Sequence, residues 1–200
     1  MYKRQVLQSY VQEDVVFASL PCGIMRDLLK LDFTGVENFR LVGIDIDSES
    51  LELAKKLSEE YGLSEKVKLY QEDAWNIPFQ EEFTLLRSSG LIVYEPDDNK
   101  VTELYRKFFQ ALKPGGILVS SFKTPCSDLD PNSERNINQL NQDDMLLSKI
   151  IFTDILNTKL RGFRSSSTTK LQLQTVGFDD IEFIWDNARM YPMVVAHKPK

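Results

Sequence analysis

Two short apolar runs, joined by a tight loop and a short helix, limit the possible folds of this chain most strongly. The first run covers residues 15–20 and is ended by residues 21–23, which read Pro-Cys-Gly. The second run covers residues 39–44 and leads directly into Asp45, which follows Gly23 by 22 residues. Apolar runs of this length between breaker residues are typical of buried strands. A carboxylate at the tip of the second strand can accept both ribose hydroxyls of an adenosine held over the first loop.

Further apolar runs alternate with helical patterns through the next part of the chain. A stripe of Leu51, Ala54 and Leu57 predicts a helix that Ser48 caps and Gly62 terminates. Strict alternation of this kind predicts an α/β fold, with a doubly wound parallel sheet and helices on both faces. The expected strands cover residues 15–20, 39–44, 66–70, 83–88 and 117–122, and the expected helices cover residues 2–13, 24–31, 48–62 and 97–112.

The alternation stops near residue 124. The segment 124–170 begins as a polar loop and continues into a broad apolar face over residues 143–157, which predicts a helix. Because it follows the fifth strand at the edge where parallel strands end, we expect a helical insertion that forms a lid or a substrate-recognition element. Two strand-like runs, residues 181–185 and 190–196, close the sequence. Residues 1–200 are therefore expected to form one domain.

Composition and charge restrict the class of protein. With 24 basic and 30 acidic side chains the formal net charge is −6, which argues against nucleic acid as the main partner. No apolar stretch reaches the roughly 20 residues that span a bilayer, and no signal-like core follows the amino terminus. We therefore expect a cytoplasmic protein that binds no membrane. Cys22 and Cys126 follow strands too far apart for a disulfide, and no metal-ligand spacing occurs.

The motifs together resemble class I S-adenosylmethionine-dependent methyltransferases over about the whole chain. The resemblance implies a Rossmann-like sheet of seven strands in the order 3-2-1-4-5-7-6, whose last strand is antiparallel. It also implies S-adenosyl-L-methionine as the cofactor and methyl transfer as the activity. The matching pieces are the first strand with its loop, residues 42–47 (VGIDID), 71–75 (QEDAW), 111–116 (ALKPGG) and 176–178 (VGF).

The loop after the first strand departs from the family pattern, in which an acidic residue precedes Gly-x-Gly-x-Gly. Aligned on Cys22, Ser19 replaces the acid, Pro21 replaces the first glycine and Met25 replaces the third, so that only Gly23 remains. The resemblance still implies that residues 19 and 21–23 contact the cofactor. The departure also leaves an alternative hypothesis, a non-catalytic binding module of the same fold with a degraded cofactor loop.

The resemblance assigns further cofactor contacts to the tips of neighbouring strands. Asp45 is expected to bind the ribose hydroxyls, and Ile46 is expected to pack on the adenine ring. Asp73, beside Ala74, is expected to accept a hydrogen bond from the adenine amino group, and Trp75 is expected to cover the ring. The remaining candidates are Ser88 and Ser89, which would face the methyl group, and Arg26 and Arg87, which would meet the methionine carboxylate.

Substrate contacts are expected just beyond the fourth strand and in the last turn. Gly90 would leave room for the acceptor, and Tyr94 and Glu95 are the candidates to orient or deprotonate it. The further candidate substrate contacts are Arg164, Arg189 and Tyr191.

His197, the single histidine, would lie at the sheet edge opposite the ligand and is expected to be structural. In-line displacement at a sulfonium methyl depends mainly on alignment, so a general base is optional.

We predict a methyltransferase that acts on a small-molecule acceptor. A nicotinamide-dependent oxidoreductase is less favoured, because residues 23–26 do not supply the Gly-x-Gly-x-x-Gly of that class. The acceptor and the oligomeric state stay open.

Overall fold

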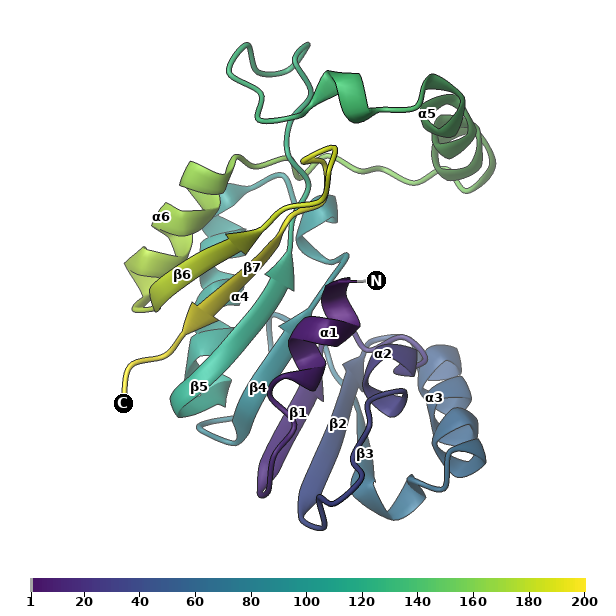
Figure 1. Cartoon of the computed structure of the whole chain (residues 1–200), viewed down its shortest axis with the longest axis vertical. Coiled ribbons are helices and arrows are strands. Elements are labelled where there is room, and N and C mark those ends of the chain that lie inside the picture. Colours follow the sequence, from purple (N-terminus) through teal and green to yellow (C-terminus); the bar gives the residue numbers. More distant parts are fainter. Residues whose placement is uncertain (1) are drawn as a thin grey trace.

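Seven strands form one sheet within residues 2–200, the part of the chain that this computed structural model describes (Figure 1). The order is β3-β2-β1-β4-β5-β7-β6, and every strand is parallel to its neighbours except β7, which is antiparallel to both β5 and β6. The predicted order and the antiparallel last strand are confirmed. The strands are β1 (Val15–Ser19), β2 (Phe39–Asp45), β3 (Val67–Gln71), β4 (Phe83–Ser88), β5 (Leu112–Ser121), β6 (Asp179–Ile184) and β7 (Met193–His197).

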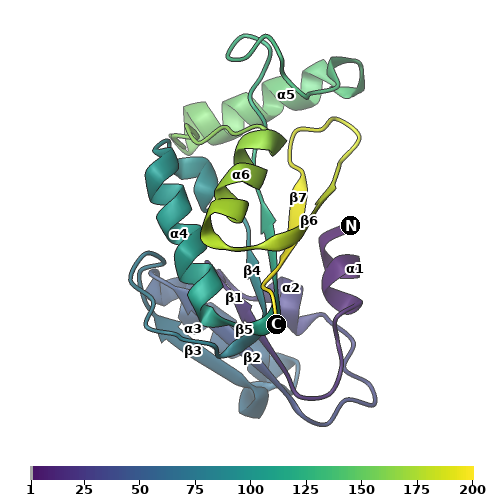
Figure 2. The same ribbon diagram turned by 90° about the vertical axis from the view of Figure 1, so that its left-hand side faces the viewer.

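Helices cover both faces of this sheet (Figures 1 and 2). One face carries α1 (Tyr2–Gln8), α2 (Arg26–Leu29) and α3 (Ser48–Glu60), and the other carries α4 (Asp98–Ala111) and α6 (Ser166–Val176). None of the helices in residues 2–200 is long and apolar enough to span a membrane.

The core consists of two apolar layers, one on each face of the sheet. Phe17 of β1 packs in the layer of α2, whereas the next residue, Ala18, packs in the layer of α4. Tyr105 and Phe108 of α4 are completely buried in that second layer. Because β1 is buried on both faces, its sequence is apolar at nearly every position rather than alternating.

The amino ends of α3 and α4 are capped by the aspartates that precede them. Asp47 accepts hydrogen bonds from the backbone N–H groups of Glu49 and Ser50, at 3.2 Å each. The prediction that Ser48 caps α3 is wrong, because Ser48 is already the first helical residue. Asp97 caps α4 in the same way. An aspartate at this position satisfies free N–H groups and adds a charge that the helix dipole favours.

The insertion after β5 lies over the carboxyl ends of the strands (Figures 1 and 2). It contains a 3₁₀ turn η3 (Ile137–Gln139), α5 (Gln142–Lys149) and a π-helix η4 (Ile150–Ile155). The helix predicted over residues 143–157 is therefore present, but its second half is a π-helix. The insertion is shorter than the segment 124–170, since the last residues of that segment belong to α6.

Candidate functional site

Asp45 lies at the carboxyl end of β2 and faces the loop that follows β1. Its Oδ2 accepts a hydrogen bond from the Gly23 N–H at 2.8 Å, and its Oδ1 accepts one from the Asp47 N–H at 3.1 Å. The two strand tips are neighbours because Ser19 of β1 pairs with Gly43 of β2. Asp45 is 8% exposed, and each oxygen keeps a further lone pair. This carboxylate can therefore accept hydroxyl groups from a ligand while the backbone holds it in place.

The loop after β1 keeps the backbone conformation that glycine favours, although only one of the usual glycines is present. Gly23 has φ 49° and Met25 has φ 55°, both in the left-handed region. The Met25 side chain is buried and fills the space beside Gly43, where an added Cβ would contact its sulfur. A Cβ built on Gly23 meets no atom within 4 Å. Met25 therefore points into the core and leaves the outer side of the loop open, and α2 is reduced to a single turn after it.

Arg87 contacts Ser19, the residue at the position of the missing acid. Its Nη1 donates to Ser19 Oγ at 3.1 Å and to the Pro21 carbonyl at 3.3 Å. Its Nε lies 2.6 Å from Oδ2 of Asp27 at the start of α2. Of the two arginines predicted to meet an anionic group, Arg87 thus lies beside the loop, whereas Arg26 is exposed. A cation and an anion together stand at the tip of β1.

Cys22 belongs to the same loop and holds it against β2. Its backbone N–H donates to the Ile44 carbonyl at 2.9 Å, and its Sγ donates to the Gly23 carbonyl at 3.2 Å. The side chain is 5% exposed. Burial, reinforced by the nearby Asp45 carboxylate, raises the pKa of the Cys22 thiol to about 12. Cys22 therefore positions the loop as a neutral thiol, and both Cys22 and Cys126 are free cysteines.

Ile46 and Asp73 follow the tips of β2 and β3. Ile46 is 68% exposed, so its apolar side chain is accessible to a ligand. The Asp73 carboxylate accepts from the Trp75 N–H at 3.1 Å and from the side-chain amide of Asn76 at 2.8 Å. Ala74, between them, is buried. Together these residues offer an apolar surface and an acceptor along one edge.

Trp75 turns toward α4. Its indole N–H donates to the Lys100 carbonyl at 3.0 Å. With Asp73 and Glu95 it lines a hollow of about 410 Å³ against the first turns of that helix. The ring thus packs beside α4, and contact between Trp75 and an adenine stays a prediction.

A cavity of about 290 Å³ opens at the carboxyl ends of β4 and β5. Ser88 pairs with Ser120 at this point and is 1% exposed, and Ser89 is half-buried. Gly90 follows with φ 81°, and a Cβ built there meets no atom within 4 Å. The lining residues come from the loop after β4, from β5 and the residue after it, from the insertion and from the turn before β7: Gly90, Val93, Tyr94, Ser121, Phe122, Phe152, Leu160 and Tyr191.

Three of the predicted substrate contacts, Gly90, Tyr94 and Tyr191, therefore meet in this cavity. Glu95 does not line it. Its Oε1 accepts from the Asp97 N–H at 2.9 Å, and its Oε2 lies 3.6 Å from Lys100 Nζ. The carboxylate is thus held at the start of α4, and we infer that it does not act as a general base.

The two predicted arginine contacts also lie outside the cavity lining. The Arg189 guanidinium stacks 5.2 Å from the centre of the Trp185 ring. Arg164 is 3% exposed, and its three nitrogens donate to Asp98 Oδ1 at 2.7 Å and to the carbonyls of Ile92 and Glu95 at 3.2 and 2.8 Å. Arg164 fixes the end of the insertion to α4 and to the 3₁₀ turn η2 (Ile92–Tyr94). Because these nitrogens donate to the protein itself, we infer that Arg164 stabilises the fold and does not contact the substrate.

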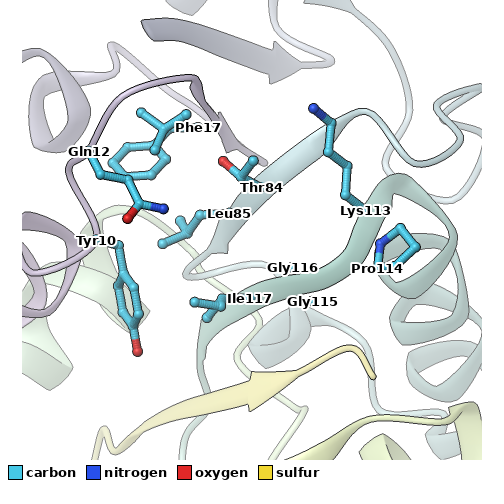
Figure 3. A pocket seen from close by; sticks show the side chains of 11 residues that line it. Tyr10, Gln12, Phe17, Thr84, Leu85, Lys113, Pro114, Gly115, Gly116 and Ile117 are labelled. Carbon is cyan, nitrogen blue, oxygen red and sulfur yellow. The ribbon is translucent and has the colours of Figure 1, made fainter. Parts of the chain in front are cut away.

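Another cavity, of about 170 Å³, opens at the amino ends of β1, β4 and β5 (Figure 3). Tyr10 and Gln12 lie across it from Leu85 and Ile117. Because the parallel strands run away from this edge, it is remote from the Asp45 site. His197 lies at the same edge, opposite Ile117 in the register of β5 and β7, as expected from the sequence.

Sequence reasoning missed Asp27, Phe152 and Leu160. Asp27 is the one acid between residues 20 and 31, a signal that could have drawn attention to it, but an acid in a first helical turn is common. Phe152 and Leu160 are two of many apolar residues in the insertion, and only the path of the chain brings them over β4 and β5.

Comparison with known proteins agrees with this fold. The model of a family described as a methyltransferase domain matches residues 19–116, about half of the chain. The solved structure of a possible exported protein from Bordetella parapertussis is 42% identical, with a TM-score of 0.93, and the match covers 98% of this chain and 66% of that one. A S-adenosylmethionine-dependent methyltransferase from Methanosarcina mazei is 18% identical, with a TM-score of 0.68 and 97% of both chains covered, and it shows the shared fold.

A curated relative, sterol 24-C-methyltransferase from Pneumocystis carinii, is 28% identical over 116 residues, which cover 57% of this chain and 29% of that protein. The matched part of this chain spans less than half the length of that relative and of three further curated relatives. With the sheet order, the Asp45 site and the matched domain taken together, the chain belongs to the class I S-adenosylmethionine-dependent methyltransferase family.

Proposed function

We propose that the protein binds S-adenosyl-L-methionine at the carboxyl ends of β1, β2 and β4 and transfers its methyl group to a small molecule. The observation that supports this most strongly is the buried carboxylate of Asp45, which the Gly23 N–H holds at 2.8 Å. That pairing sets a hydroxyl acceptor beside an open backbone loop, an arrangement suited to the ribose of an adenosine.

The residues at the site suit this cofactor in shape and in charge. Gly23 leaves open space beside the loop, and the exposed side chain of Ile46 offers a surface for the adenine ring. Asp73 at the next strand tip supplies an acceptor for the adenine amino group. The ion pair of Arg87 and Asp27 offers both signs of charge to the carboxylate and the amino group of the methionine end.

The chemistry asks little of the protein beyond alignment. When bound, the cofactor supplies a methyl group on a positively charged sulfur, which is ready for in-line displacement. The cavity beyond the tip of β4 would hold the acceptor in line with that methyl, and such alignment lowers the barrier by removing motional freedom beforehand. The hydroxyls of Tyr94 and Tyr191, which line this cavity, can donate to or accept from the acceptor and orient it.

The small-molecule class of acceptor is supported by the size of the cavity and by the charge of the chain. A volume of about 290 Å³ lies just below the range that is usual for small-ligand pockets, about 300–1,000 Å³, and leaves room only for a small acceptor. The net charge of −6 disfavours a polyanionic partner. Nucleic acid is therefore not proposed as the substrate.

Two measurements test this function. Calorimetric titration with S-adenosylhomocysteine and, separately, with NAD⁺ should show binding of the first ligand alone; binding of NAD⁺ alone would favour the oxidoreductase alternative. Incubation with S-adenosylmethionine and a low-molecular-mass cell extract should then release S-adenosylhomocysteine in amounts that depend on the extract. Tight cofactor binding without turnover in any extract would favour the non-catalytic alternative.

A further inference from the structure

The cavity at the tips of β4 and β5 is bounded by aromatic rings. Tyr94, Phe152 and Tyr191 reach it from three different segments and are 52%, 47% and 45% exposed. Val93, Phe122 and Leu160 complete the apolar lining. Among the described residues that line this cavity, none carries a charge. A ligand that covered the three rings would remove a large apolar surface from water.

Two basic side chains near this cavity, Lys123 and Arg135, are engaged with other groups of the protein. Lys123 Nζ lies 5.1 Å from the centre of the Tyr191 ring and 5.5 Å from that of Phe163. The side chain of Arg135 donates to Thr124 Oγ1 at 3.3 Å and also to the Thr124 carbonyl. An anionic ligand in the cavity would lose its hydration without gaining a counter-charge from a residue of the lining, which is costly.

The insertion is built so that Phe152 reaches the cavity. The helix changes from α to π at Ile150, and the Leu156 N–H donates to the Ile151 carbonyl, five residues back, at 2.9 Å. Single turns of π-helix occur frequently at functional sites. The returning chain is fixed to η2, because the Gly162 N–H donates to the Val93 carbonyl at 2.8 Å. Phe152 and Leu160 are thus carried on a segment attached to the cavity floor.

We propose that the methyl acceptor is an uncharged, largely apolar small molecule that stacks between Tyr94, Phe152 and Tyr191. This inference rests on the proposed function, because it names the class of acceptor for the same site. It follows from the uncharged lining, the three rings and the position of the cavity beyond the β4 tip. Carboxylates and phosphates would not be accepted here.

The test uses a series of probes, because the natural acceptor is not identified. Binding of 4-methylphenol, 4-ethylphenol and 4-propylphenol, uncharged at pH 7, is compared with that of 4-propylbenzoate, with and without S-adenosylhomocysteine. Each added methylene should tighten binding by about three- to fourfold, as expected for full burial. The benzoate should bind at least about tenfold more weakly than the phenol of the same chain length. Affinity independent of chain length, or equal affinity for the benzoate, would overturn the proposal.

Two variants of the insertion localise the binding. Phe152→Ser removes a ring of the cavity and should abolish the dependence on chain length. Ile155→Ser changes a side chain of the same helix that is 70% exposed and does not line the cavity, and it should bind the probes as the wild type does. Equal behaviour of the two variants would contradict the proposal. Failure of S-adenosylhomocysteine to bind would count against the proposed function alone, since the cavity is present without cofactor and the probe series still reports on it.

Discussion

The backbone N–H of Gly23 donates to Oδ2 of Asp45 across 2.8 Å and joins the loop after β1 to the tip of β2. The other carboxylate oxygen accepts from the Asp47 N–H at 3.1 Å. The carboxylate is therefore fixed in one orientation by two backbone groups, and both oxygens still have a lone pair for a ligand. The loop and the acid hold one another in place at the position where we propose that the ribose binds.

Arg87 should contribute to the binding of the amino-acid end of the cofactor and not to that of its adenosine end. Arg87→Gln is expected to weaken S-adenosylhomocysteine binding about ten- to a hundredfold, since a hydrogen bond to a charged group contributes about 1.5–3 kcal/mol. 5′-Methylthioadenosine, which lacks the amino-acid end, should bind the variant as it binds the wild type. Calorimetry measures the affinity of the variant for both ligands. An equal loss of affinity for the two ligands would mean that Arg87 only supports the loop.

Cys22 should be unreactive in the folded protein. Its pKa of about 12 leaves very little thiolate near pH 8, and the side chain is 5% exposed. Titration with a disulfide reagent should therefore detect one fast thiol per folded chain, the half-buried Cys126, and two after unfolding. In Cys126→Ser the fast reaction should disappear. A fast reaction that persists in this variant would show that Cys22 is accessible.

The contribution of the Asp47 cap of α3 to the free energy of unfolding should fall at acidic pH. The hydrogen bond from the Ser50 hydroxyl, above all, holds the pKa of Asp47 below its usual value of 3.8. A lowered folded-state pKa means that the stabilising contribution is present above about pH 4 and is lost as the pH falls through the folded pKa. Asp47→Ala should thus be less stable than the wild type in urea unfolding at pH 7, and the difference should shrink below about pH 4. A stability difference between the two proteins that stays constant with pH would contradict the assignment of the Asp47 carboxylate as the cap.

Arg164 should matter for stability rather than for binding. Lysine cannot reproduce the three hydrogen bonds that the buried guanidinium makes to Asp98, Ile92 and Glu95, so Arg164→Lys should lower the unfolding free energy by about 2 kcal/mol. Arg161→Lys, at a nearby exposed position, is the matched control and should have no effect. If Arg164→Lys were as stable as the wild type but bound the phenol probes more weakly, Arg164 would be a substrate contact.

The sheet and the acid at its edge could be predicted because their signals are local. A strand such as β1, buried on both faces, is apolar at successive positions, and Asp45 is the acid that ends the second such run. The spacing of Gly23 and Asp45 then follows from one strand–helix–strand unit. These features need no knowledge of how distant segments pack.

The cavity and the role of Arg164 could not be predicted because they depend on distant segments. The acceptors of the Arg164 guanidinium lie 66 to 72 residues earlier in the chain. In the sequence Arg164 stands in a basic, hydroxyl-rich stretch that is typical of a solvated surface. Met25 gives a similar lesson, since a methionine with φ 55° cannot be inferred from composition.

The most direct test of the cofactor site is calorimetric titration of S-adenosylhomocysteine into the wild type, Asp45→Asn and Asp47→Asn. The second variant changes the neighbouring acid Asp47, whose side chain caps α3. It keeps the backbone N–H of residue 47, which donates to Asp45 Oδ1. We predict that the wild type and Asp47→Asn bind alike and that Asp45→Asn loses at least about 1.4 kcal/mol, a tenfold weakening. Equal binding by all three proteins, or no binding by the wild type, would contradict the assignment of Asp45 as the ribose anchor.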